Sequence, residues 1–271
     1  MDSTQLYSAA GNRFVLVDGL ELTPEEALEL ARALVASDEM QTFALDGVLV
    51  CVAPRHGGTC GMIVLNRDGS RAEACGNGLR CIARFAVERG LAHEELVIET
   101  DAGARPARVS HGEGDVVTVR TGMGVPEIVD TSARLELDGE IFEAALVELG
   151  NPHCVLNVDE AARAPVATLG PRFERHPRFP RGTNVGFAHM DSDGDDQGMV
   201  LRVWERGVGE TAACGTGAAA AAAAAISRGA RVSPIRVKLP GGTLTVEWDG
   251  VGELFVTGPV EAIAARQRTA S

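Results

Sequence analysis

Two short motifs place a cysteine where it could act as an acid or a base. Cys75-Gly76-Asn77-Gly78 and Cys214-Gly215-Thr216-Gly217 have the same form, and each opens a stretch with the composition of a helix. The N-terminus of a helix carries a partial positive charge and unpaired N–H groups, and both favour thiolate over thiol. The same N–H groups form a site for an anion such as a carboxylate. Glycine lets a ligand approach the backbone closely.

Two thiols on opposite sides of one carbon are suited to inverting a stereocentre. One thiolate removes the α-proton, and the opposite thiol returns a proton to the other face, which is a pairing of general base and general acid. We therefore expect the two cysteine motifs to face each other across a cleft between two domains, with a carboxylate held between the two helix ends.

The two motifs belong to a longer internal duplication with an offset of 139 residues (75 to 214). The same offset relates three further pairs: Asn12 and Asn151, Asn66 and Glu205, Gly90 and Gly229. A gap-free register of this kind predicts two similar α/β domains. We expect the first to span residues 1–121, with the C-terminal segment 258–271 returning to it, and the second to span 122–257.

Three helices are predicted between short β-like runs. The first begins with Thr23 as N-cap and Pro24 at its first position. The other two run from Gly76 to about Arg89 and from Gly215 to about Arg228, each before a glycine. The third contains eight consecutive alanines, 218–225, which indicates a buried helix with a sheet packed closely around it. The clearest strands are predicted at 14–17, 48–52, 116–119, 199–201 and 243–246.

Composition excludes several classes of protein. The 271 residues carry 25 basic and 38 acidic side chains, a net charge of −13, so the basic surface that nucleic-acid binding needs is not expected. No apolar run is long enough to span a membrane, and no signal peptide is evident, which predicts a cytoplasmic protein. The six cysteines are too sparse for a disulfide scaffold, and four of them are predicted to be structural: Cys51, Cys60, Cys81 and Cys154.

Cofactors and metals are not expected. The chain has one lysine, Lys238, in a predicted surface strand, so pyridoxal phosphate has no evident anchor. No zinc-ligand spacing is present, and glycine-rich residues 76–78 lack a dinucleotide fingerprint. The acidic run 191–196 lacks the glycine and glutamate positions of a calcium loop and is predicted to be a hairpin loop.

Taken together, the motifs resemble those of the diaminopimelate epimerases, which are cofactor-independent two-cysteine enzymes of lysine and cell-wall biosynthesis. The similar stretches occur in the family's order over nearly the whole chain. They are residues 66–70, 74–81, 150–155, 183–187, 205–211 and 214–217. The resemblance implies an α/β fold of two pseudo-symmetric domains, each a curved, mainly antiparallel sheet around a central helix. It also implies a homodimer.

The resemblance implies a role for each matching residue. Cys75 and Cys214 match the catalytic acid and base, and His153 and Glu205 match groups that help to deprotonate them. The backbone cradle for the reacting carboxylate matches Gly76, Asn77, Gly215 and Thr216. The residues that hold the substrate match Asn12, Asn66, Asn151, Asn184, Glu205 and Arg206. Arginine can bind a remote carboxylate bidentately, and asparagine oxygens and a carboxylate can accept from ammonium groups.

The sequence departs from the family pattern within its first fifty residues. Arg13 stands where the family commonly has aspartate, and residues 42–47 replace a glycine-rich element. These changes concern the N-terminal rim of the expected site and leave the cysteine motifs intact.

The implied reaction is the interconversion of LL- and meso-2,6-diaminopimelate. The nearest alternative is another two-cysteine amino-acid racemase, such as one acting on histidine. A thiol redox protein is a further alternative, although the chain lacks a Cys-x-x-Cys motif. A third is a binding protein of low catalytic activity, in which the altered rim has cost turnover.

Overall fold

The computed structural model describes residues 4–73, 75–112, 116–191 and 198–263. Its residues divide into two compact units. Unit 1 extends to Thr121 and resumes at Gly258, and unit 2 runs from Gly122 to Thr257. Most of the predicted hairpin loop at 191–196, and the end of the predicted returning segment, residues 264–271, lie outside the described residues.

Unit 1 is built on strands that pair in chain order, from β1 to β7. The pairs β2–β3 and β4–β5 are parallel, and the other neighbours with a described register are antiparallel. Its elements are β1 (Thr4–Ala9), β2 (Asn12–Gly19), α1 (Pro24–Val35), α2 (Glu39–Thr42), β3 (Gly47–Val52), β4 (Cys60–Asn66), α3 (Gly76–Glu88), β5 (Glu95–Thr100), β6 (Gly103–His111) and β7 (Val117–Gly124).

Unit 2 repeats this arrangement, with the strand order β9, β10, β11, β12, β14, β15, β16 and an added outer strand β8. The pairs β10–β11 and β12–β14 are parallel, and the others are antiparallel. Its elements are β8 (Glu127–Leu137), β9 (Glu140–Glu148), β10 (Pro152–Asn157), η1 (Ala161–Arg163), α4 (Val166–Glu174), β11 (Asn184–Met190), β12 (Gly198–Glu205), β13 (Gly209–Thr211), α5 (Gly215–Ser227), β14 (Ile235–Leu239), β15 (Gly242–Glu247) and β16 (Leu254–Ile263).

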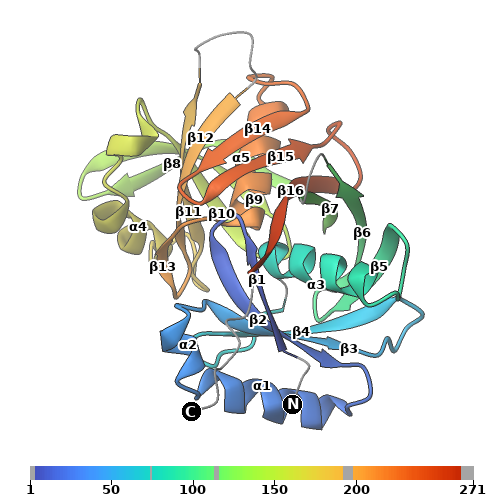
Figure 1. Cartoon of the computed structure of the whole chain (residues 1–271). Coiled ribbons are helices and arrows are strands. Elements are labelled where there is room, and N and C mark those ends of the chain that lie inside the picture. Colours follow the sequence, from blue (N-terminus) through green and yellow to red (C-terminus); the bar gives the residue numbers. More distant parts are fainter. Residues whose placement is uncertain (1–3, 74, 113–115, 192–197, 264–271) are drawn as a thin grey trace. The chain divides into compact units, whose positions relative to one another are not determined.

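A single helix occupies the centre of each unit. Helix α3 contacts every strand from β1 to β6, and α5 contacts β8 to β12, β14 and β15. A helix can touch so many strands only if the sheet curves around it, as Figure 1 shows for both. The predicted fold class, two similar mainly antiparallel sheets around central helices, is confirmed.

The composition of each central helix fits its surroundings. Residues 218–225 of α5 are all at most 4% exposed, so the predicted burial of the alanine helix is confirmed. Helix α3 instead packs Leu79, Ile82 and Phe85 into the core of unit 1. Both helices end as predicted, with Gly90 and Gly229 in the left-handed conformation that glycine favours.

Two helices cover outer faces. Helix α1 begins with the predicted cap, in which Thr23 and Glu26 form a reciprocal capping box. It lies on the face of β3 and β4 opposite α3 (Figure 1). Helix α4, which packs on β11 and β12, was not among the predicted helices. Its N-cap is Pro165, no side chain caps it, and Pro171 lies inside it, so it lacks the usual sequence signals of a helix.

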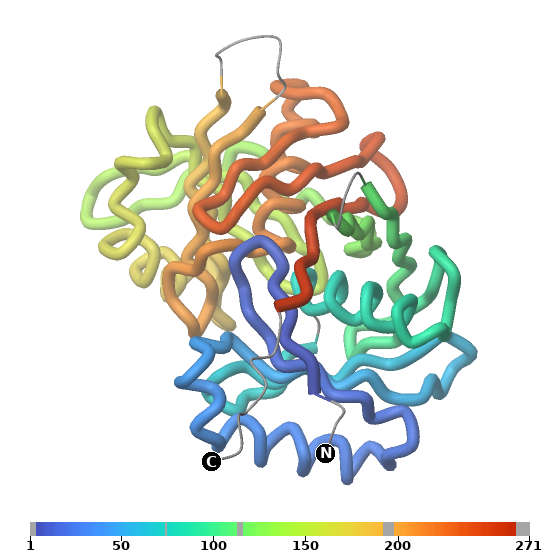
Figure 2. The backbone as a smooth tube through the Cα atoms, viewed as in Figure 1, coloured from blue at the N-terminus to red at the C-terminus, as the bar shows by residue number. Residues whose placement is uncertain are grey.

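The chain end returns to unit 1 through β16. Figure 2 shows the end of this strand, in red, beside β1, in blue. Residues 261–263 pair antiparallel with Leu6–Ser8, and Val260 is buried in the core of unit 1.

Candidate active site

Cys75 is the N-cap of α3, as its motif predicts. Its backbone is extended, and the N–H of Gly78 donates to its Sγ at 3.4 Å. The thiol is half-buried and packs against the core of unit 1. The sulfur therefore already receives one of the N–H groups that would stabilise a thiolate.

Cys214 occupies the same position on α5. Its Sγ accepts from the N–H of Gly217 at 3.3 Å and lies 3.4 Å from the Thr216 hydroxyl. This thiol is 5% exposed. The duplication seen in the sequence thus reproduces the same local geometry around both sulfur atoms.

The third helical residue is a glycine in both copies because the sulfur and a neighbouring side chain leave little room there. A Cβ added to Gly78 would lie 2.9 Å from Cδ2 of Leu49, and one added to Gly217 would lie 3.1 Å from Cγ2 of Val203. The second would also lie 3.3 Å from the sulfur of Cys214. A side chain at either position would therefore make close contacts beneath the thiol.

A buried polar chain lies behind Cys75. Asn77, which is 3% exposed, donates from Nδ2 to Oδ1 of Asn12. Its own Oδ1 accepts from Nη2 of Arg80 at 2.5 Å, and Nη1 of Arg80 donates to the carbonyl of Gly76 at 3.3 Å. Burial lowers the pKa of Arg80 to about 10, so the guanidinium stays charged at neutral pH. Two predicted site residues, Asn12 and Asn77, are thus in contact.

Asn66 ends strand β4 and lies in a polar turn. Its Nδ2 donates to the hydroxyl of Ser70 at 2.9 Å. Ser70 also donates from its backbone and hydroxyl to Asp68, and these hydrogen bonds hold the pKa of Asp68 below its ordinary value. The structure therefore gives Asn66 a fixed orientation within the turn.

Glu205 lies beside Cys214. It ends strand β12 and accepts a hydrogen bond of 2.5 Å from the hydroxyl of Thr211. Burial raises the pKa of Cys214 well above its ordinary value, and the Glu205 carboxylate raises it further. The hydrogen bonds from Thr216 and Gly217 act in the opposite direction. Cys214 is therefore a thiol at neutral pH.

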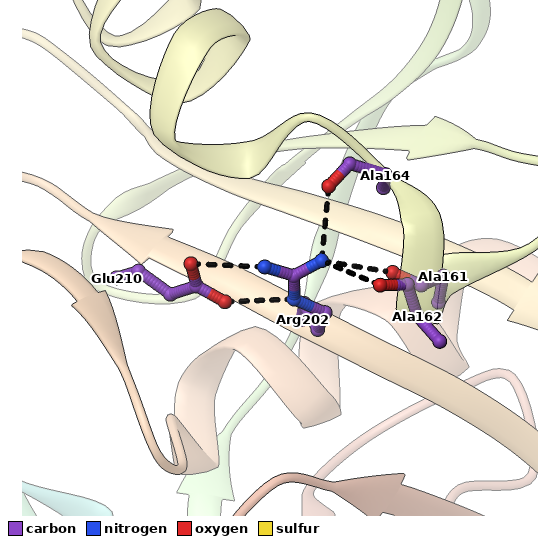
Figure 3. Close-up of polar contacts among 5 residues, drawn as sticks. All are labelled: Ala161, Ala162, Ala164, Arg202 and Glu210. Carbon is purple, nitrogen blue, oxygen red and sulfur yellow. Dashed lines mark hydrogen bonds and ion pairs between the residues drawn. The ribbon is translucent and has the colours of Figure 1, made fainter.

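A clamp around Arg202 fixes the hairpin that carries Thr211 (Figure 3). Arg202 on β12 makes a bidentate ion pair with Glu210 on β13, at 2.7 and 3.0 Å. Its Nη1 also donates to three carbonyls around η1, those of Ala161, Ala162 and Ala164. The clamp joins β12, β13 and η1 next to the Glu205–Thr211 pair. Arg202 was not among the predicted site residues, because an alternating strand pattern does not reveal which carbonyls a side chain reaches.

His153 is buried on β10, at 2% exposure. Its Nε2 lies 2.9 Å from Oδ1 of Asn151, and this contact joins two of the predicted site residues. Burial, followed by the nearby Arg206 guanidinium, lowers the pKa of His153 to about 3. The imidazole is therefore neutral at ordinary pH and can accept a proton only where an anion stabilises the product.

Asn184 and Arg206 are also in contact. Asn184 donates to the carbonyl of Pro152 at 3.1 Å and accepts from the backbone N–H of Arg206 at 3.0 Å. The exposed guanidinium of Arg206 donates to the carbonyl of Arg181 at 3.3 Å. Gly182 lies against this side chain, since an added Cβ would be 3.0 Å from its Cδ.

A cavity of about 200 Å³ opens in unit 2 beside His153. Arg178 and Arg181 lie in its lining, together with Gly182 and Glu148. Neither arginine was predicted, since arginines in a loop without a motif give no signal in a single sequence.

The two segments that depart from the family pattern, at Arg13 and at residues 42–47, are in contact. The N–H of Arg13 donates to the carboxylate of Asp46 at 2.8 Å, and the N–H of Asp46 donates to the carbonyl of Arg13 at 2.8 Å. The β1–β2 turn, through Ala10 and Gly11 with positive φ, presents the neighbouring Asn12.

The remaining predictions concern the cysteines, Lys238, metal sites and membrane-spanning helices. All six cysteines are thiols, and the four predicted to be structural are buried. Lys238 lies on β14 and forms an ion pair of 2.8 Å with Asp191. In the described ranges, no cluster of three His, Cys, Asp or Glu residues could hold a metal ion. No described helix is long and apolar enough to cross a membrane.

Comparison with known proteins identifies the family. The family model described as diaminopimelate epimerase matches residues 4–129 and 145–263. The chain belongs to the diaminopimelate epimerase family. It is 45% identical to the diaminopimelate epimerase of Pseudomonas syringae pv. tomato over 214 residues, which are 74% of this chain and 75% of that protein. It is 42% identical to that of Alkalilimnicola ehrlichii over 267 residues, 93% of each chain. The family and the enzyme class expected from the motifs, an epimerase, are confirmed.

Solved structures agree on the fold. A phenazine biosynthesis protein of the PhzF family from Bacillus anthracis matches with a TM-score of 0.72 at 16% identity, over 97% of both chains. A probable proline racemase from Agrobacterium radiobacter K84 matches with a TM-score of 0.70 at 18% identity, over 99% of this chain and 93% of that one. At such identities the likeness concerns the fold alone.

Proposed function

We propose that this member of the diaminopimelate epimerase family interconverts LL- and meso-2,6-diaminopimelate by moving a proton between the thiols of Cys75 and Cys214. The observation that carries the proposal is the repeated cysteine cap. Each sulfur stands at the N-terminus of a central helix and accepts the N–H of the third helical residue. Two thiols, one at the N-terminus of each central helix, are what a two-base inversion needs.

The proton balance is simple. The thiolate takes the α-proton, and its electron pair stays on the α-carbon, delocalised into the carboxylate. The other thiol then gives its proton to the opposite face and becomes the thiolate. The reaction needs no cofactor and no metal, because the backbone N–H groups at the helix ends stabilise the developing charge. Unit 1 contributes one base and unit 2 the other.

The remaining residues hold the substrate. The reacting carboxylate binds to the backbone of Gly76, Asn77, Gly215 and Thr216. The amino groups and the distal carboxylate bind to Asn12, Asn66, Asn151, Asn184, Glu205 and Arg206. His153 and Glu205 assist deprotonation of the cysteines, since each can accept a proton close to the site. The protein acts in the cytoplasm as a homodimer, in the synthesis of lysine and of cell-wall precursors.

The first test is proton NMR of the reduced protein with LL-diaminopimelate in D2O. We expect the α-proton signal to disappear while a chiral assay detects the meso form. A folded, reduced protein that gives neither result would contradict the substrate assignment. Exchange with a different amino acid in a substrate panel would instead assign the chain to another two-cysteine racemase.

The second test concerns the cysteines. We expect Cys75→Ala and Cys214→Ala each to lose epimerisation by at least about 100-fold, because general acid–base catalysis contributes on that order. Cys154→Ala is the matched control, since this thiol lies in the apolar core of unit 2 and should be dispensable for turnover. Near-normal turnover of either active-site variant would refute the two-base mechanism.

A further inference from the structure

The two cysteine-capped helices share their geometry but not the charges around them. At the 139-residue offset, Arg80 on α3 corresponds to Ala219 on α5, and Asn66 corresponds to Glu205. Unit 1 therefore has a cation near its thiol, whereas unit 2 has an anion near its own. Both differences act in the same direction, towards a thiolate in unit 1 and a thiol in unit 2.

Arg80 is held in place within the first turns of α3. It is fully buried, and it donates to the carbonyl of Gly76 and to Oδ1 of Asn77. Through Asn77 it orients Asn12 on strand β2. Its Nε is buried and has no hydrogen-bond partner among the described residues. The side chain thus links the N-terminal backbone of α3 to a second strand.

A buried cation needs an anion to offset its desolvation. The two ionisable groups that influence the pKa of Arg80 are the thiols of Cys81 and Cys75. Burial raises the pKa of Cys81, which keeps that thiol neutral. Cys75 is less buried than Cys81, and its sulfur accepts the N–H of Gly78.

Several ionisable side chains packed around α3 pair with one another or lie at its far end. Tyr7 from β1 donates to Glu88 at the far end of the helix, where Glu88 also pairs with Arg84. Cys51 from β3 and Cys60 from β4 lie next to each other, joined by a side-chain hydrogen bond. The side chains that β2, β5 and β6 contribute to this core are apolar.

We propose that Arg80 is a positioning residue that holds the Asn77–Asn12 pair and favours the thiolate of Cys75 over that of Cys214. The inference rests on the proposed function for the role of the Cys75 thiolate as a base. It assigns Arg80 two separable effects, one through charge on the thiol and one through hydrogen bonds on the asparagines.

The charge effect is tested without substrate. The rate at which iodoacetamide alkylates Cys75 is followed by peptide-resolved mass spectrometry across pH in the full-length protein and in Arg80→Met. Loss of a nearby cation is expected to raise the midpoint of this pH profile by about one unit, which slows alkylation below it about tenfold. Arg84→Met is the matched control, since it removes the same charge one turn further along α3, and its profile should match that of the parent protein.

A further variant separates the two effects. Arg80→Lys keeps the charge but loses the forked donors, so its midpoint should shift less than that of Arg80→Met while the KM for diaminopimelate rises. A midpoint shift as large as in Arg80→Met would overturn the charge effect, and an unchanged KM would overturn the positioning effect. Circular dichroism confirms folding, and Arg80→Gln replaces Arg80→Met as the neutral variant if the latter does not fold.

The outcomes are distinguishable from those that test the proposed function. An unchanged Cys75 midpoint in folded Arg80→Met, with an active parent enzyme, overturns the role of Arg80 alone. A parent protein that neither exchanges nor epimerises diaminopimelate overturns the proposed function, whereas a shifted midpoint in that protein still supports the effect of Arg80 on the thiol.

Discussion

At the scale of single residues, burial decides which form of each ionisable group the site contains. His153 and Cys214 are both nearly inaccessible to solvent, and burial is the largest influence on the pKa of each. It lowers the pKa of the imidazole and raises that of the thiol, so that both groups are kept neutral. The unprotonated imidazole can accept a proton and the protonated thiol can donate one, which are the forms that acid–base catalysis uses.

The low pKa of His153 has a consequence for stability. The unfolded chain binds a proton at this imidazole below its ordinary pKa of 6.5, whereas the folded protein does so only near 3. The unfolded state therefore gains protons first, and His153 makes the free energy of unfolding fall as the pH decreases from about 6.5 towards 3, by at most about 1.4 kcal/mol per pH unit. Its stabilising effect is complete above that window.

Urea unfolding at pH 7 and pH 5 measures this dependence. The stability lost between the two pH values should be smaller in His153→Gln than in the parent protein, by about 1–2 kcal/mol. The exposed His111→Gln is the control and should retain the parent's loss. An identical loss in His153→Gln would show that the imidazole is protonated in the folded state.

The sequence motifs predicted where these residues lie in the chain, but not their contacts or their burial. Cys75, Cys214 and the duplicated register follow from local patterns, because a helix cap depends on a few consecutive residues. The Asn12–Asn77–Arg80 chain joins residues 65 positions apart, and its existence depends on the pairing of strands that no local pattern specifies. Asn151 lies just before the strand that carries His153, and neither their contact nor the burial of His153 follows from a local pattern.

At the scale of elements, the first turn of each central helix is where packing and chemistry coincide. The N–H of its third residue binds the sulfur, and the missing side chain at that residue lets a neighbouring strand come close. The two copies differ in what an added methyl group would meet. In α3 it would meet the end of a flexible leucine, and in α5 a valine and the sulfur itself.

We therefore expect Gly217→Ala to be more harmful than Gly78→Ala. Alanine within a helix is intrinsically more stable than glycine, by about 1 kcal/mol. This gain offsets the cost of the close contacts, so the melting temperature should change little. A displaced Cys214 sulfur should nevertheless lower kcat about tenfold, because proton transfer depends on alignment. Measured kcat values and thermal melts of the two variants check this expectation, and equal kcat values would contradict it.

Helix prediction succeeded where the helix ends carry their own signals and failed where they do not. Thr23, Gly90 and Gly229 mark the ends of α1, α3 and α5. Helix α4 has a proline before it and another within it. It forms because Val166 and Phe173 are buried against β11 and β12, which is a tertiary effect.

At the scale of the whole molecule, the chain is two copies of one strand order, and the first copy depends on the last residues described. Residues 258–263 provide Val260 for the core of unit 1, a carbonyl that accepts from Arg84 at 2.7 Å, and a partner for strand β1. The duplicated register made two similar domains predictable. It did not predict which neighbouring strands pair in parallel and which antiparallel, because strand pairing depends on long-range contacts.

Truncation after Thr257 should therefore weaken unit 1 selectively. We expect a loss on the order of 3 kcal/mol, from the lost core contact and hydrogen bonds. Hydrogen exchange should accelerate in β1 and α3, while α5 keeps its protection. Val260→Ala, which removes only core contacts, should cost less, about 2 kcal/mol. Equal acceleration in α3 and α5 would argue against selective weakening.

The eight alanines of α5 bear on conformational entropy. Ordering an alanine side chain loses no rotamer freedom, whereas each buried leucine, isoleucine or arginine of α3 loses about 0.5–2 kcal/mol. Residues 218–225 of α5 therefore become ordered without that cost, and they have no alternative rotamers into which they could relax. The sulfur of Cys214 is thus held by backbone packing, whereas the turn behind Cys75 depends on the single rotamer that Arg80 adopts.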